Sequence, residues 1–93
     1  SRSNDPLTED YALVGLVSGL DPAHQVLILA GTTTFGTQGA VEFVSRADSI
    51  RKLLARLPKD WASEAKPFEA LVRVKIARGV PVETELVAVH TRR

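Results

Sequence analysis

The stretch QVLILAGTTTFGTQGAVEFV, from Gln25 to Val44, decides the fold that we predict for this chain. Its apolar run from Val26 to Ala30 is typical of a buried strand, and the run ends at Gly31. Three threonines follow, and after Gly36 the apolar residues recur at helical spacing. The stretch therefore predicts a strand, a small polar loop and a helix whose N-terminus can present backbone N–H groups to an anion or polar ligand.

Length and composition predict one small globular domain. The 93 residues are 44% hydrophobic and 25% charged, a balance that argues against disorder. The net charge of +1, with both signs interleaved, indicates no nucleic-acid site and no attraction to an acidic membrane. No apolar run reaches the roughly 18–20 residues that a membrane span requires. Cysteine is absent, which excludes disulfides and thiol chemistry. We expect a cytoplasmic protein.

The beginning of the chain differs in composition from the rest. We interpret residues 1–9 as a linker, and we expect residues 10–93 to form a single α/β domain that is a fragment of a larger protein.

Two strands are predicted before the threonine loop. Residues 10–18 are apolar on both faces, as in a strand covered on two sides. Residues 25–30 show the same character and are predicted to form a central strand. Because only about six residues connect them, we expect the two strands to pair in antiparallel.

Two helices are predicted after the loop. The first should begin near Gly36 or Thr37, with Thr34 or Gly36 as its N-cap, and run to about Arg46. The second, capped by Asp48 or Ser49, should end before Pro58. Apolar residues at helical spacing should face the sheet: Ala40, Phe43, Val44 and Ala47 in the first helix, and Ile50, Leu53, Leu54 and Leu57 in the second.

The last third of the chain predicts a hairpin. Residues 68–77 and 81–91 both alternate in polarity. A three-residue loop, Arg78 to Val80, would place oppositely charged and apolar residues face to face. The expected pairs are Lys75 with Glu83, Arg73 with Glu85, Ile76 with Val82, and Val72 with Leu86.

The sum is a β-β-α-α-β-β chain. With the helices as a right-handed crossover, the third strand should lie parallel to the second. We therefore predict a small mixed sheet, similar to half of a Rossmann fold, that ends in an antiparallel hairpin.

The threonine loop is the candidate site. Gly31 and Gly36 have the glycine spacing of a phosphate-binding loop, but Thr37-Gln38 stands where that motif needs Lys-Ser/Thr. The GxGxxG pattern is missing too, because Thr33 occupies its second glycine position. A carboxylate, a sugar phosphate or a neutral polar ligand could still bind there. Alternatively, the threonines only satisfy backbone groups at a tight turn. The candidate ligand-binding residues are Thr32, Thr33, Thr34, Gly36 and Thr37.

No catalytic or metal-binding constellation is visible. His24 and His90 lack convergent carboxylates at ligand spacing, and no serine has the context of a hydrolase nucleophile. We expect no enzyme activity, no cofactor and no metal. Trp61 could be an interface anchor, although covering one end of the sheet is the simpler role.

Several motifs resemble the C-terminal segment of a group of bacterial multidomain proteins that have no established activity. Their AGxTxxGTxxAxEF block matches eight residues: Ala30, Gly31, Thr33, Gly36, Thr37, Ala40, Glu42 and Phe43. A Pro58-to-Trp61 corner and the final Ala88-x-His90 match as well, and Gly39 departs from an alanine-like position. The resemblance implies a part of a larger sensor or regulator, with an upstream domain of the same protein as partner.

Two hypotheses follow. The first is a non-enzymatic ligand-binding or regulatory domain that uses the threonine loop. The second is a structural domain that forms homodimers through an exposed sheet edge. Neither involves nucleic acid or membrane insertion through this domain.

Overall fold

The computed structural model describes residues 8–19, 25–64 and 66–91. Its elements follow in the order β1 (Thr8–Ser18), β2 (Gln25–Gly31), α1 (Thr34–Ser45), α2 (Ala47–Arg56), α3 (Trp61–Glu64), β3 (Phe68–Ala77) and β4 (Val80–Thr91). The α/β class is as predicted, while the four-residue helix α3 was not predicted. Strand β1 begins at Thr8, two residues before the predicted domain boundary.

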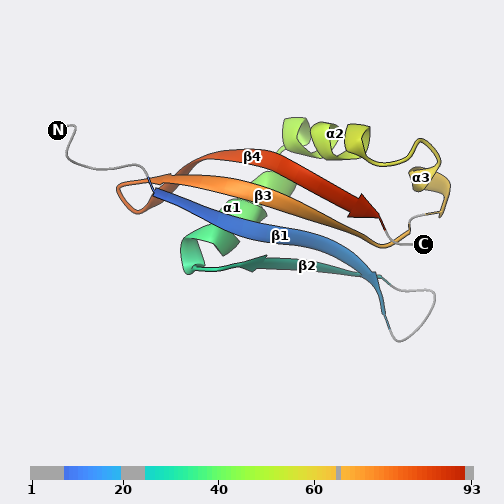
Figure 1. Ribbon diagram of the computed structural model, residues 1–93, viewed down its shortest axis with the longest axis horizontal. Coiled ribbons are helices and arrows are strands. Elements are labelled where there is room, and N and C mark those ends of the chain that lie inside the picture. The colour runs from blue at the N-terminus through green and yellow to red at the C-terminus, as the bar shows by residue number, and fades with distance from the viewer. Residues whose placement is uncertain (1–7, 20–24, 65, 92–93) are drawn as a thin grey trace.

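The four described strands form one antiparallel sheet in the order β2-β1-β3-β4 (Figure 1). The predicted mixed, Rossmann-like sheet is therefore wrong for the described strands, and β2 is an edge strand rather than a central one. The reason is that β1 lies between β2 and β3. Strands β2 and β3 run in the same direction, since both are antiparallel to β1, but they are not neighbours.

The antiparallel pairing of the first two strands is confirmed. Their register is continuous over seven pairs, from Ala12 with Gly31 to Ser18 with Gln25. The pair at the middle of the ladder is Gly15 with Ile28.

The closing hairpin has most of the predicted register. Lys75 pairs with Glu83, Arg73 with Glu85 and Val72 with Leu86, as expected. The turn is shorter than predicted, because only Arg78 and Gly79 connect the strands, with φ values of 56° and 72°. A register shift next to Ile76 compensates: Ile76 pairs with Pro81, not with Val82 as predicted, and the predicted register then holds from Lys75 to Val72, where a second shift follows.

Helix α1 begins earlier than predicted. Its N-cap is Thr33, not Thr34 or Gly36. Helix α2 begins at Ala47 and has Arg46 as an N-cap without a side-chain hydrogen bond, so the expected cap at Asp48 or Ser49 is wrong. Of the predicted inner residues of α2, Leu53 and Leu57 are buried and Leu54 is exposed.

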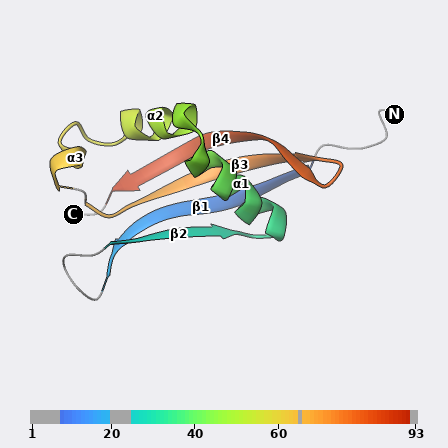
Figure 2. The ribbon, with the colours of Figure 1, turned by 180° about the vertical axis from the view of Figure 1, so that it is seen from behind.

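The helices lie on one face of the sheet. Seen from behind, α1 crosses the strands from the end of β2 toward β4, and α2 continues beside β4 (Figure 2). The core lies under this layer and contains Ala12, Val14, Ala40, Phe43, Leu53, Leu57, Phe68, Ala70, Val72, Val74 and Ile76. Trp61 packs edge-on against Phe68, with ring centroids 5.7 Å apart, which fits the role of covering one end of the sheet.

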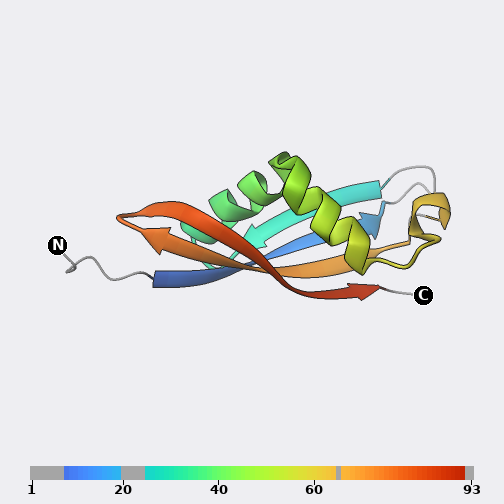
Figure 3. The ribbon, with the colours of Figure 1, turned by 90° about the horizontal axis from the view of Figure 1, so that it is seen from above.

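The opposite face of the sheet carries no described helix (Figure 3). We call it the outer face. It contains the alternate residues of each strand: Tyr11, Leu13, Gly15 and Val17 of β1, Val26, Ile28 and Ala30 of β2, and Leu71, Arg73 and Lys75 of β3. No helix in the described part of the chain is long and apolar enough to cross a membrane.

Candidate functional site

The threonine loop is organised around Asp10, a residue that the sequence analysis did not single out. Asp10 lies on the helix side of β1 and is only 6% exposed. Its carboxylate accepts hydrogen bonds from the hydroxyl groups of Thr32 and Thr33, the latter at 2.6 Å. The backbone N–H groups of Thr33 and Tyr11 also donate to it, at 3.1 and 2.9 Å. One carboxylate thus connects β1 to the loop that follows β2.

The charge of Asp10 is stabilised by these donors. Burial would raise the pKa of the Asp10 carboxyl, but hydrogen bonds from the Thr33 hydroxyl and from the backbone of Tyr11, Thr33 and Gly36 hold the pKa below its ordinary value. The positive end of the α1 dipole lies at the same place and favours a negative charge. Asp10 is therefore an ionised internal partner of the N-terminus of α1.

Thr33 connects Asp10 to the helix. While its hydroxyl donates to Asp10, its oxygen accepts from the backbone N–H groups of Phe35 at 3.1 Å and Gly36 at 3.4 Å. Gly36 has no room for a side chain, since a Cβ there would collide with the Asp10 carboxylate. The loop, the carboxylate and the first turn of α1 are thus tightly packed.

Thr37 provides a hydrogen-bond acceptor for the backbone at the end of β2. Its hydroxyl oxygen accepts a hydrogen bond from the backbone N–H of Gly31 at 3.0 Å. A side chain at Gly31 would collide with the backbone of Gly36 and Thr37. Strand and helix therefore approach each other closely at this corner.

The five predicted ligand residues consequently have different positions. Thr32, Thr33 and Gly36 are brought together around Asp10, Thr37 bonds to Gly31, and Thr34 is the first residue of α1 with an exposed side chain. Asp10 stands where an anionic ligand would sit, so a ligand that used the same donors would have to displace it. Ligand binding at this loop stays a prediction, and the described contacts give the loop a structural role.

Comparison with protein-family models, with curated proteins and with solved structures finds no match to this chain.

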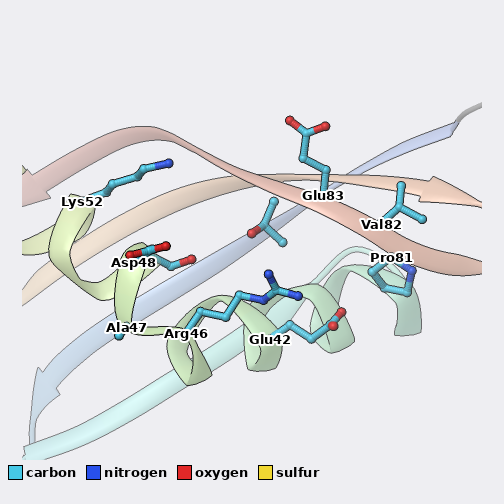
Figure 4. Close-up of a pocket in the computed structure, with 10 residues that line it drawn as sticks. Glu42, Arg46, Ala47, Asp48, Lys52, Pro81, Val82 and Glu83 are labelled. Atoms are coloured by element: carbon cyan, nitrogen blue, oxygen red, sulfur yellow. The ribbon is translucent and has the colours of Figure 1, made fainter.

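A second candidate is the groove between the two long helices and β4. One hollow of about 470 Å³ lies between the end of α1, the start of α2 and the start of β4. An adjoining hollow of about 510 Å³ continues along α2 and β4. Figure 4 shows the charged side chains around the first hollow, namely Glu42, Arg46, Asp48, Lys52 and Glu83. These side chains carry both signs of charge, so the groove has no surplus of one sign that would point to a cation or an anion.

The described residues form no recognisable catalytic centre. In that part of the chain, no group of three His, Cys, Asp or Glu side chains could hold a metal ion. His90 is exposed and lies opposite Glu69 on β3. His24 lies outside the described residues.

The third candidate is the apolar surface around β2. Val26, Leu27 and Ile28 are 47%, 51% and 44% exposed, although they belong to the most hydrophobic run of the chain. The outer face beside them has a hollow of about 430 Å³, lined mainly by Leu13, Val17, Ile28 and Ala30. Gly15, which pairs with Ile28, also lines this hollow. The prediction that this run is central is therefore wrong for the single domain, although a run that is apolar on both faces is typical of a central strand.

Proposed function

We propose that this domain is a non-enzymatic self-association module, in which two copies join through the edge of β2. The observation that carries the proposal is the exposure of Val26, Leu27 and Ile28 on a strand that pairs on one side only within the described part of the chain. Exposed apolar patches of this kind are typical of interaction surfaces. An unpaired edge also offers a row of backbone N–H and C=O groups to another strand.

The two edges of the sheet differ in a way that supports the choice of β2. Strand β4 has the features with which proteins protect an edge, namely Pro81, two register shifts and the acidic residues Glu83 and Glu85. Strand β2 contains no proline and no charged residue, and its ladder with β1 has no irregularity. Only β2 is therefore suited to receive another strand.

The polarity of the outer face supports the same edge. Toward β4 this face carries ion pairs, with Arg73 2.7 Å from Glu85 and Lys75 3.9 Å from Glu83. Toward β2 it carries Leu13, Val17 and Ile28 instead. A contact at β2 would therefore bury apolar surface without desolvating these ion pairs.

A pair of matched lysine variants tests the proposal. Leu27→Lys places a charge on the β2 edge, while Val82→Lys places one at a residue of β4 that is 58% exposed. In light scattering over a range of concentrations, we expect wild type and Val82→Lys to form dimers and Leu27→Lys to remain monomeric. Because both side chains are exposed, neither variant should unfold the domain, which circular dichroism checks.

Two outcomes would overturn the proposal. A wild-type chain that is monomeric at every concentration would show that the β2 edge is not a homodimer contact, and would favour another part of a longer protein as its occupant. Equal dimerisation of the Leu27→Lys variant would show that the dimer forms elsewhere.

A further inference from the structure

We infer that the two copies pair their β2 strands in antiparallel about a two-fold axis that passes beside Ile28, which makes one continuous eight-stranded sheet. The inference rests on the proposed self-association and specifies its geometry. The occupant of the edge is a second copy of this chain. Three features of β2 support this pairing: its outward backbone groups, the half of the strand that α1 leaves uncovered, and the extent of its apolar run.

The backbone of β2 identifies the groups that a second copy would meet. The N–H of Thr32 donates to the carbonyl of Tyr11 on β1 at 3.2 Å. Backbone groups of successive residues in a strand point to alternate sides, so those of Val26, Ile28 and Ala30 also point toward β1. The groups of Leu27 and Leu29 therefore point to the free edge. The N–H of Gly31 points outward as well, as its bond to the Thr37 hydroxyl confirms.

The uneven cover of β2 favours the antiparallel direction. Leu27 and Leu29 share the helix side of the strand, but Leu29 is half-buried whereas Leu27 is 51% exposed. Helix α1 starts beside the Gly31 end, and no helix of the described residues lies over the Gln25 end (Figure 2). Antiparallel pairing places Leu27 of one copy opposite Leu29 of the other, near the other copy's helix. Parallel pairing would instead leave the two open ends side by side.

The apolar run fixes the register. Its five residues, Val26 to Ala30, have Ile28 at their midpoint. With a two-fold axis beside Ile28, all five apolar residues of one copy lie opposite the five of the other. Leu27 of each copy then exchanges two backbone hydrogen bonds with Leu29 of the other copy. An axis beside Leu27 would overlap only three of the five. An axis beside Leu29 would likewise overlap only three of the five, Ile28 to Ala30, and would place the occupied N–H of Gly31 opposite Leu27 instead of at the end of the ladder.

Composition and symmetry agree with this arrangement. The strand has no charged residue, so self-pairing brings no like charges together. A two-fold axis perpendicular to the sheet gives the closed, self-complementary contact that most homodimers have, and keeps both helix layers on the same side. On the outer face, Ile28 meets its own copy and joins the apolar patches of the two domains.

Single cysteines test the geometry, because the chain contains none of its own. In the inferred pairing, Ile28 faces Ile28 as a non-hydrogen-bonded pair with Cα atoms about 4.5 Å apart, a separation that suits a disulfide. Two copies of Leu27, or of Leu29, would lie two residues out of line, roughly 8 Å apart, beyond the reach of a disulfide. The matched controls are therefore Leu27→Cys and Leu29→Cys.

Under mild oxidation, we expect Ile28→Cys to form a covalent dimer on a non-reducing gel and each control alone to remain unlinked. An equimolar mixture of Leu27→Cys and Leu29→Cys should form a mixed disulfide, since these two positions face each other. Light scattering of each reduced variant establishes that it still dimerises, and circular dichroism that it folds.

Each other outcome has a distinct meaning. Self-linkage of Leu27→Cys without Ile28→Cys overturns the register, and self-linkage of all three variants indicates parallel strands and overturns the direction. A fourth variant, Leu13→Cys, probes the outer face, and its linkage alone would place the contact there and overturn the edge pairing. A monomer without any linkage overturns the proposed function together with this inference, whereas a dimer with a different linkage pattern overturns the inference alone.

Discussion

Asp10 is the residue on which the corner between β1, β2 and α1 depends. Four donor groups from Thr32, Thr33 and Tyr11 surround its carboxylate. The oxygen of the N-cap Thr33 also accepts a hydrogen bond from the backbone of the first turn of α1. Hydrogen bonds to a charged group are stronger than those between neutral groups. A neutral side chain at this position would leave donors without a partner.

We therefore predict that Asp10→Asn destabilises the domain by about 1–3 kcal/mol at pH 7. The amide keeps one acceptor oxygen but turns a donor group toward the N–H and hydroxyl donors of Thr33. Urea denaturation followed by circular dichroism measures the change. Asp48→Asn is the matched control, because Asp48 is an exposed carboxylate of α2 whose pairing with Arg51 should contribute little.

The same carboxylate predicts a pH dependence with a defined sign. The folded pKa of Asp10 lies below its unfolded value of about 3.8. Its contribution to stability is therefore complete above that value and is lost as the pH falls through the folded pKa. The stability difference between wild type and Asp10→Asn should narrow below about pH 3.8. A difference that stayed constant down to pH 2 would contradict the assigned role.

The threonine loop could be predicted from sequence, but its partner Asp10 could not. The glycine spacing and the threonines correctly marked Gly31 to Thr37 as a strand-to-helix corner. Asp10 was missed because it lies 22 residues before Thr32, and no local pattern indicates such a contact. The sequence does contain one signal for this contact. Asp10 alternates with Ala12 and Val14 along β1, so its carboxylate lies on the buried face of the strand. A buried carboxylate needs hydrogen-bond donors from neighbouring residues.

At the scale of elements, the packing of α1 on the sheet depends on Gly39. A Cβ at Gly39 would lie 2.6 Å from both γ-methyl groups of Val74 on β3. The helix therefore lies closer to the sheet than an alanine would permit. The glycine at this position thus has a local reason, since Val74 occupies the space that a side chain would need.

We predict that Gly39→Ala destabilises the domain by about 1–3 kcal/mol through overpacking, in spite of the better helix propensity of alanine. The compensating change is Val74→Ala, which removes the two methyl groups. In a double-mutant cycle by urea denaturation, Gly39→Ala should cost less in the Val74→Ala background than in wild type. Equal costs in the two backgrounds would show that the helix moves aside freely.

The pairing of β3 with β4 could be predicted from sequence, because the charged pairs and the apolar pairs both indicated the same register. The detail at its end could not. A two-residue turn followed by a bulge gives the same register from Lys75 to Val72 as a plain three-residue loop. The turn requires positive φ at both Arg78 and Gly79, and only the glycine is typical of that conformation.

At the scale of the whole molecule, the order of the strands in the sheet could not be predicted from local sequence patterns. An apolar run such as Val26 to Ala30 indicates that both faces avoid water, and the usual interpretation is a central strand. The described fold places β1 and β3 at the centre and β2 at the edge. If a second copy adds a strand to β2, β2 becomes a central strand of the assembly. The apolar run then indicates a central strand, as such runs usually do.

This view leads to a prediction about thermal stability. When folding is coupled to association, mass action stabilises the folded state as the protein concentration rises. The Tm of wild type should therefore increase between low and high micromolar concentration, and the Tm of Val82→Lys should increase in parallel. The Tm of Leu27→Lys should be independent of concentration and equal to the low-concentration limit of wild type. Scanning calorimetry or circular dichroism melting over a hundredfold range of concentration provides the measurement.

The comparison separates association from intrinsic stability. If Leu27→Lys only weakened the fold, its Tm would be lower than that of wild type but would keep the same dependence on concentration. If the edge of β2 is the contact, the dependence itself disappears while the monomer remains folded, because Leu27 is already half exposed in the single domain. A wild-type Tm that does not change with concentration would mean that the apolar run is stable at an open edge, and would contradict the proposed pairing.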